Sequence, residues 1–116
     1  MEFAKSVKLN GDKDTYSISP DIKKFTLMDL GFEQTRMGNF EYKGSLDTDN
    51  PFKPIARLRI LINADLDGFK METVSGNGAR KINIFTHQRS AEFVEQLHFI
   101  LKEMCERNVF INDEGK

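Results

Sequence analysis

The sequence predicts an α+β fold in which two antiparallel β-sheets, built from hairpins and a meander, pack against one long C-terminal helix. Three observations lead to this class. Apolar residues recur at helical spacing near the C-terminus, and apolar and polar residues alternate in three runs of the second half. Apolar residues also occur on the outer faces of these elements, so a second layer is needed to cover them. A short N-terminal helix completes the predicted fold.

The first predicted elements are a hairpin and the short helix. "FAKSVKL" (residues 3–9) and "TYSIS" (residues 15–19) are strand-like, and Asn10-Gly11 between them enters a tight turn easily. Ser19-Pro20-Asp21 predicts a helix start, because it offers a capping hydroxyl, a proline for the first turn and an acid at the positive end of the helix dipole. Gly31 is predicted to end this helix.

A second hairpin and a meander follow. "FEQTR" and "NFEYKGSL" flank a turn at residues 37–39, and two prolines indicate a loop at residues 47–54. The strands of the meander are predicted at "ARLRILINAD", "FKMETV" and "RKINIF", which begin at residues 56, 69 and 80.

The glycine-rich stretch between the last two of these strands has two interpretations. A phosphate-binding loop needs its glycines between a strand and a helix, so that backbone amides and the helix dipole converge on the anion. Here Gly76-Asn77-Gly78 leads into another strand-like run, and no hydroxyl follows Lys81. We therefore predict a hairpin turn with Gly76 or Gly78 at positive φ, and no anion held by its amides.

One long helix is predicted from about Gln88 to Arg107, capped by Thr86 or Ser90 and followed by a short edge strand at "VFI". Phe99 lies opposite the apolar stripe of this helix, among four glutamates. We expect the N-terminal half of the chain to cover it, with a dimer interface as the alternative. The apolar residues on outer strand faces that support this second layer are Leu61, Val74 and Phe85.

The composition indicates a single domain at residues 1–116, which we expect in the cytoplasm. The 17 basic and 18 acidic residues give a net charge of -1, which weighs against a nucleic-acid partner. The single cysteine, Cys105, allows no intramolecular disulfide, and the apolar runs are too short to span a membrane. We expect no membrane association, and a monomer in preference to a dimer.

A basic cluster is the candidate functional site. Arg57 and Arg59 share one strand face, Arg80 and Lys81 begin another strand, and Lys70 lies between them in the meander. Guanidinium and ammonium groups bind carboxylates and phosphates, so these five residues predict a surface for an anionic ligand. The alternative is that they pair across strands with Glu72.

No other motif indicates a reaction. His87 and His98 are not spaced as a helical metal pair, and the Asp-rich stretches at residues 47–50 and 65–68 lack the further ligands of a calcium loop. His98 and Cys105 are about 10 Å apart along a helix, too far for a hydrogen bond. Cys105 is therefore predicted to be a half-buried packing residue. We expect no metal and no cofactor, and no catalytic residue is identified.

The segments "LNGDKDTYSISP" and "DIKKFTLMDLGFEQTRMGNFEYKGSL" resemble a small family from lactic acid bacteria, catalogued as a domain of unknown function associated with amino-acid metabolism. The resemblance covers nearly the whole chain. It implies an α+β fold with two sheets on one main helix. It also implies a role in amino-acid metabolism, with cysteine or sulfur metabolism as the narrower case. No catalytic residue carries over from this family.

The sequence leaves two functions open. The first is an accessory protein of amino-acid metabolism that binds a small metabolite or a partner enzyme. The second is a small enzyme that acts on an amino-acid-like substrate, with Arg57 or Arg59 holding the carboxylate of that substrate. A binder of single-stranded nucleic acid is the weakest alternative, because the charge balance is against it.

Overall fold

The computed structural model describes residues 3–50 and 52–112. Its larger sheet has the strand order β3-β4-β5-β6, and all neighbouring strands are antiparallel. Alternate side chains of β5 and β6 are buried on one face, as the two-residue period of the sequence predicts. The strands are β3 (Glu33–Gln34), β4 (Phe40–Ser45), β5 (Ala56–Ile62) and β6 (Phe69–Ser75).

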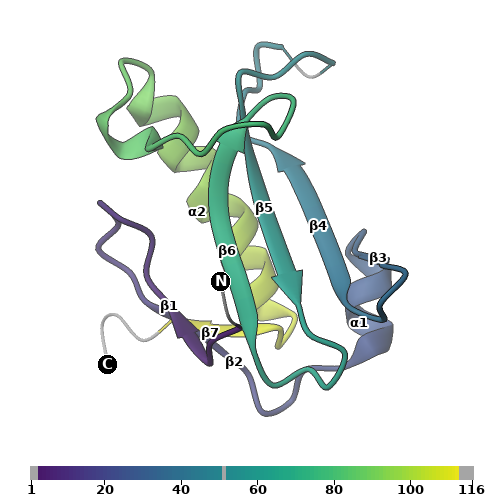
Figure 1. Cartoon of the computed structure of the whole chain (residues 1–116). Coiled ribbons are helices and arrows are strands. Elements are labelled where there is room, and N and C mark those ends of the chain that lie inside the picture. Colours follow the sequence, from purple (N-terminus) through teal and green to yellow (C-terminus); the bar gives the residue numbers. More distant parts are fainter. Residues whose placement is uncertain (1–2, 51, 113–116) are drawn as a thin grey trace.

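The long helix α2 (Ser90–Glu106) crosses the buried face of this sheet (Figure 1). It lies within the range predicted for it, and its apolar stripe packs against the sheet in the core that both share. The predicted cap is wrong, because the residue at the N-cap position is Arg89, and its side chain makes no capping bond. The buried residues of the stripe are Phe93, Leu97, Ile100, Leu101 and Met104.

The smaller sheet is built from strands near both ends of the described chain. Its strands are β1 (Ser6–Val7), β2 (Tyr16–Ile18) and β7 (Phe110–Asn112), with β2 in the middle and both pairings antiparallel. The rings of Phe69 in β6 and Phe110 in β7 lie with their centroids 4.7 Å apart, so the two sheets share one core. The predicted class, α+β with two antiparallel sheets and one long helix, is confirmed.

The short helix begins later than predicted. The hydroxyl of Ser19 accepts a hydrogen bond from the amide of Asp21, and the Ser19 carbonyl accepts one from Ile22, so this segment is a turn. Lys23 is extended, and the helix α1 (Lys24–Asp29) starts only after it. Ile22 packs against the core from the turn.

The strand predicted at residues 80–85 is also wrong. It makes one isolated bridge, between Val74 and Lys81, and the chain then forms the 3-10 helix η1 (Ile84–Thr86). The side chain of Asn83 accepts a hydrogen bond from the amide of Phe85, which turns the backbone out of the extended conformation.

Phe99 is not covered, contrary to the prediction. Its side chain is 64% exposed, whereas Val74 is buried and Leu61 and Phe85 are half-buried. The smaller sheet is present, but it packs into the core on the helix side, where Phe110 contacts Phe69, and that core includes neither Leu61 nor Val74. It also leaves this position on α2 exposed. Among the described residues, no helix is both long enough and apolar enough to cross a membrane.

Candidate functional site

The connections at one end of the larger sheet enclose the candidate site. The loop from β4 to β5 and the turn that follows β6 lie at the same end, because alternate connections of an antiparallel meander share an end (Figure 1). A cavity of about 580 Å³ opens between them. Residues that line it include Lys53, Pro54, Arg57, Gly76, Asn77 and Arg80.

The two walls of the cavity are in direct contact. A Cβ atom added to Gly76 would lie 1.8 Å from the carbonyl oxygen of Pro54, so only glycine fits at this position. Gly78 has a φ of 77°, and the amide of Ser75 donates to the carbonyl of Arg80. The predicted turn with a glycine at positive φ is confirmed at Gly78, although one isolated bridge takes the place of the second strand, and this turn holds Arg80 on one wall.

Asp47 anchors the opposite wall. Its side chain is fully buried and accepts hydrogen bonds from the amide of Ile55 and the side chain of Asn50. The guanidinium of Arg89 also donates to it, with Nη2 2.8 Å from Oδ1. These donors, Arg89 first, hold the pKa of Asp47 well below its usual range, against the opposing effect of burial. The loop that carries Lys53 is therefore tied to the start of α2.

Arg57 is the central residue of the cavity. It is half-buried on β5, and its Nε atom is buried without a hydrogen-bond partner among the described residues. Lys53 and Arg80 extend from the two walls and form no ion pair with any residue in the described ranges. None of the described lining residues is acidic. Three cationic side chains thus surround a cavity in a protein whose net charge is -1.

Arg59 and Lys81 are already paired. Arg59 lies 2.9 Å from Glu41 and 2.8 Å from Glu72, and these hydrogen bonds raise its pKa. Lys81 lies 3.6 Å from the other oxygen of Glu72. The alternative interpretation, cross-strand pairing with Glu72, therefore describes these two residues. Arg59 still borders the main site, because it and Arg57 line an adjoining cavity of about 390 Å³.

The structure brings together part of the predicted cluster and adds one residue. Arg57 and Arg80 line the same cavity, whereas the ammonium of Lys70 lies 4.6 Å from the ring of Phe3 and lines only a small separate hollow. Lys53 was missed, because its loop has no periodic pattern. The order of the strands could have revealed Lys53, because an antiparallel meander places this loop beside the turn that follows β6.

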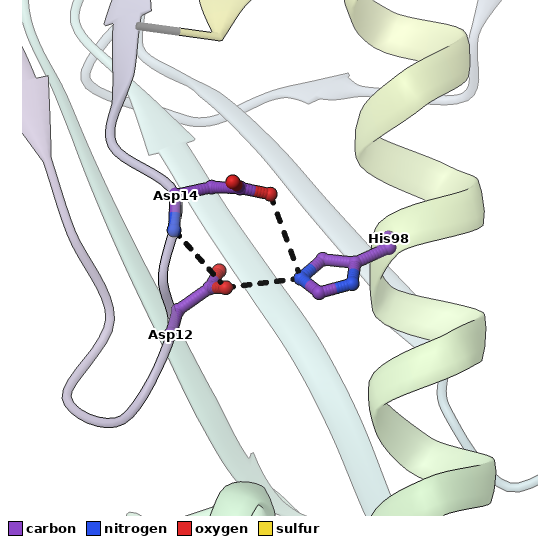
Figure 2. Close-up of side chains that lie close together, drawn as sticks. All are labelled: Asp12, Asp14 and His98. Carbon is purple, nitrogen blue, oxygen red and sulfur yellow. Dashed lines mark hydrogen bonds and ion pairs between the residues drawn. The ribbon is translucent and has the colours of Figure 1, made fainter. Parts of the chain in front are cut away.

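A second polar cluster lies between the β1–β2 turn and α2. Asp12 and Asp14 from the turn point toward His98 on the helix (Figure 2). Burial, followed by the charges of these two aspartates, raises the pKa of Tyr16, whose hydroxyl donates to Asp14. Nothing in the spacing along the chain relates His98 to this turn, so the sequence alone suggests only His87 and Cys105 as neighbours to compare with it.

Cys105 borders this cluster and is half-buried, as predicted. Burial raises the pKa of its thiol, and the nearby carboxylates of Asp14 and Glu106 act in the same direction. A hydrogen bond with the backbone of Asn112 opposes them. A raised pKa leaves a smaller fraction of the nucleophilic thiolate at neutral pH.

Comparison with known proteins identifies the family. The family model of DUF1831, whose description reads "Putative amino acid metabolism", matches residues 1–111. The chain is similar to a crystal structure, at 1.20 Å resolution, of a DUF1831 family protein from Lactobacillus plantarum. The two share 47% sequence identity with a TM-score of 0.89, over 97% of this chain and 99% of that chain. No curated protein matches the chain. The resemblance seen in the sequence is confirmed, and the chain belongs to the DUF1831 family.

Proposed function

We propose that this protein binds a small anionic metabolite of amino-acid metabolism, with Arg57 holding a carboxylate of the ligand. The observation that carries the proposal is the buried Nε of Arg57, which has no partner among the described residues. A buried charged donor without an acceptor costs free energy, and a bound carboxylate would remove that cost. Lys53 and Arg80 would add attraction from both walls.

The cavity suits a compact polar ligand. Its volume of about 580 Å³ exceeds that of a single amino acid, so a ligand with one carboxylate and a short side chain fits beside several waters. Asn77 is exposed at the turn, and its side-chain amide can donate to the polar groups of the ligand, while its oxygen accepts from Ser75 and Ala79. A sulfur-containing amino acid such as cysteine is the narrower case of this ligand class.

Binding is favoured over catalysis at this cavity. None of the described residues that line it is a histidine, cysteine, aspartate or glutamate, so the lining offers no imidazole, thiol or carboxylate as a general base. The hydroxyl of Ser75 is 2.8 Å from Oδ1 of Asn77 and accepts from the amide of Arg80, so it is held by the turn. We place this role in the cytoplasm, as an accessory to an enzyme that uses or produces the metabolite.

Calorimetric titration tests the proposal. The ligands are L-cysteine, L-aspartate and L-glutamate, with inorganic phosphate and sulfate as anions that lack a carboxylate. We expect saturable binding of at least one amino acid, and a loss of about tenfold to 100-fold in affinity for Arg57→Gln, because a hydrogen bond to a charged group contributes about 1.5 to 3 kcal/mol. Higher salt should weaken binding to the wild type.

Arg36→Gln is the matched control, since it makes the same change at an exposed position near the turn between β3 and β4. That turn lies at the opposite end of the sheet, so binding should be unchanged. The proposal fails if none of the amino acids saturates the wild type, or if Arg57→Gln binds as tightly as Arg36→Gln.

A further inference from the structure

Two carboxylates are buried side by side in the β1–β2 turn. Asp12 is 4% exposed and Asp14 is 6% exposed, and the amide of Asp14 donates to Oδ1 of Asp12. Moving an ionised carboxylate out of water is costly unless it is paired or binds a metal ion. Two such groups in one turn repel each other, which increases the cost. A positive charge beside the pair would offset this cost.

The described protein compensates for only part of this charge. The Nε2 atom of His98 lies 3.0 Å from Oδ1 of Asp12 and 3.8 Å from Oδ2 of Asp14 (Figure 2). Oδ2 of Asp12 and Oδ1 of Asp14 are buried and have no hydrogen-bond partner among the described residues. Lys13 and Lys102 line the neighbouring cavity but form no ion pair with either aspartate. Oδ2 of Asp12 and Oδ1 of Asp14 can therefore still accept a positive ligand.

The three side chains are held in place before any ligand arrives. The turn closes with the amide of Asp12 donating to the carbonyl of Leu9 at 2.9 Å. Gly11 packs so closely on Phe85 that an added Cβ would lie 2.8 Å from that side chain. The hydroxyl of Tyr16 donates to Asp14, and His98 is fixed on the middle of α2. Such support limits the movement of the three side chains and keeps them facing one another.

We propose that Asp12, Asp14 and His98 form a binding site for a divalent transition-metal ion. One imidazole nitrogen and two carboxylates are ligands that zinc, manganese, cobalt and ferrous iron accept, whereas calcium and magnesium prefer oxygen alone. The ligand atoms of the three residues all lie within 4.8 Å of one another. Metal–ligand distances of about 2.0 to 2.2 Å require ligands about 3 to 3.5 Å apart, so a small inward movement completes the site.

The site is open to solvent on one side. His98 is 32% exposed, and a cavity of about 320 Å³ bordered by Asp14, Tyr16 and His98 leads to it. A metal ion held by three protein ligands would thus keep positions for water. None of these residues lines the cavity of Lys53, Arg57 and Arg80, so the two sites are separate. The metal proposal therefore does not depend on the proposed function.

A second acidic cluster of the chain differs, because an arginine side chain already neutralises it. Asp47, Asp49 and Glu92 also lie within 4.8 Å of one another, but the guanidinium of Arg89 lies between them and bonds to all three. All the carboxylate oxygens that are buried there have partners. In the cluster of Asp12, Asp14 and His98, by contrast, two buried carboxylate oxygens have no hydrogen-bond partner among the described residues.

Titration with Co²⁺ and Zn²⁺ after removal of metal by EDTA tests the proposal. We expect one equivalent to bind the wild type, with Co²⁺ giving visible d–d absorption, and the metal to raise the melting temperature by mass action. Asp12→Asn, Asp14→Asn and His98→Gln should each weaken affinity by at least about 100-fold, more than the effect of an outer residue. Circular dichroism checks that each variant is folded.

Two controls locate the ion. Asp49→Asn changes the cluster occupied by Arg89 and should leave affinity unchanged. Cys105→Ser should also leave it unchanged, and the Co²⁺ spectrum should lack the near-ultraviolet charge-transfer band of a thiolate ligand. Failure of the wild type to bind Co²⁺ or Zn²⁺ stoichiometrically overturns the proposal. Equal binding by folded Asp12→Asn and His98→Gln overturns it as well, because His98 would then be a partner in an ion pair alone.

Discussion

Gly76 and Gly78 are two positions apart in one turn, yet they are required for different reasons. At Gly76 the constraint is space, because the carbonyl of Pro54 occupies the position where a Cβ atom would lie. At Gly78 the constraint is conformation, because φ is 77° while no atom lies within 4 Å of an added Cβ. A steric clash with backbone must be relieved by moving the loop, whereas a left-handed residue only loses conformational energy.

Alanine at each position separates these effects. Gly76→Ala should destabilise the protein by about 2 to 3 kcal/mol, because the loop that carries Lys53 must shift. Gly78→Ala should cost about 1 kcal/mol, the usual penalty for a left-handed residue with a side chain. Urea denaturation of both variants measures the difference. Equal costs would mean that the loop yields to the new methyl group without strain.

Cys105 should react slowly with thiol reagents. Its pKa is raised, chiefly by burial, so at any pH near neutrality less thiolate is present than for a free cysteine. The rate of labelling by dithionitrobenzoate at pH 8 should be well below that of the same protein in denaturant, and should rise as the pH approaches the raised pKa. Cys105→Ala should retain amino-acid binding. Rapid labelling of the folded protein would contradict this view of the thiol.

Among the site residues, sequence reasoning identifies charge but not pairing. Arg57 and Arg59 are two residues apart in one strand and lie on the same face. Arg59 forms ion pairs with two glutamates, whereas Arg57 forms none with the described residues. The difference depends on strand register, which places Arg59 opposite Glu72 and Arg57 opposite Val74. Register is set by the whole meander, so neither residue's own neighbours in the sequence reveal it.

At the scale of elements, one ion pair links the loop from β4 to β5 with the start of α2. Asp47 accepts hydrogen bonds from the guanidinium of Arg89 and from the amide of Ile55. These bonds hold both the first turn of α2 and the wall of the cavity in place. Arg89 occupies the N-cap position without a side-chain capping bond, and its guanidinium pairs with Asp47 from the loop. The sequence pattern for a cap at Ser90 could not show this, because Arg89 is fixed by a residue from a distant loop.

The stability contributed by Asp47 should depend on pH. Its pKa is lower in the folded than in the unfolded chain, so its contribution is present above the unfolded pKa of about 3.9 and declines as the pH falls through and below that value. Asp47→Asn should cost about 2 kcal/mol at pH 7, from the lost charge-assisted hydrogen bonds. Denaturation at pH 7, 5 and 3 should show the gap between wild type and variant closing only at the acidic end. A gap that is constant down to pH 3 would exclude the ion pair as its source.

The strand predicted at residues 80–85 shows why an alternating pattern is insufficient. Ile82 and Ile84 do face the core, as the alternation indicates, but one as an isolated extended residue and the other in η1. Asn83 lies between them and bonds to the amide of Phe85, a local interaction that competes with strand pairing. The burial could therefore be predicted from the sequence, whereas the backbone conformation could not.

At the scale of the whole molecule, the two-sheet architecture was predictable and the environment of Phe99 was not. The fold class follows from the alternating strand patterns and the apolar stripe of the long helix, which the sequence displays directly. The coverage of a single helix position depends on how far the second layer extends. The smaller sheet packs near the C-terminal end of α2 and leaves Phe99 exposed (Figure 1).

Phe99 and Phe93 offer a matched comparison on the same helix. Phe99→Ala should change the free energy of unfolding by no more than about 0.5 kcal/mol, as for other exposed sites. Phe93→Ala should cost about 3 to 5 kcal/mol, because that ring is fully buried in the core. Denaturation at two widely separated protein concentrations provides the check. A larger loss for Phe99→Ala that grows with concentration would indicate that the exposed ring lies in a dimer interface.

The pairing of β2 with β7 has a consequence for how the protein is made. Tyr16 pairs with Asn112, so nearly the whole described chain must leave the ribosome before the smaller sheet can close. Contacts between distant segments form slowly, because loop closure precedes the gain from the contact. The meander of β4, β5 and β6 pairs only sequential neighbours and can form first. During synthesis, the edge of β2 that pairs with β7 therefore stays open, and an open strand edge exposes a nascent chain to aggregation and to chaperones.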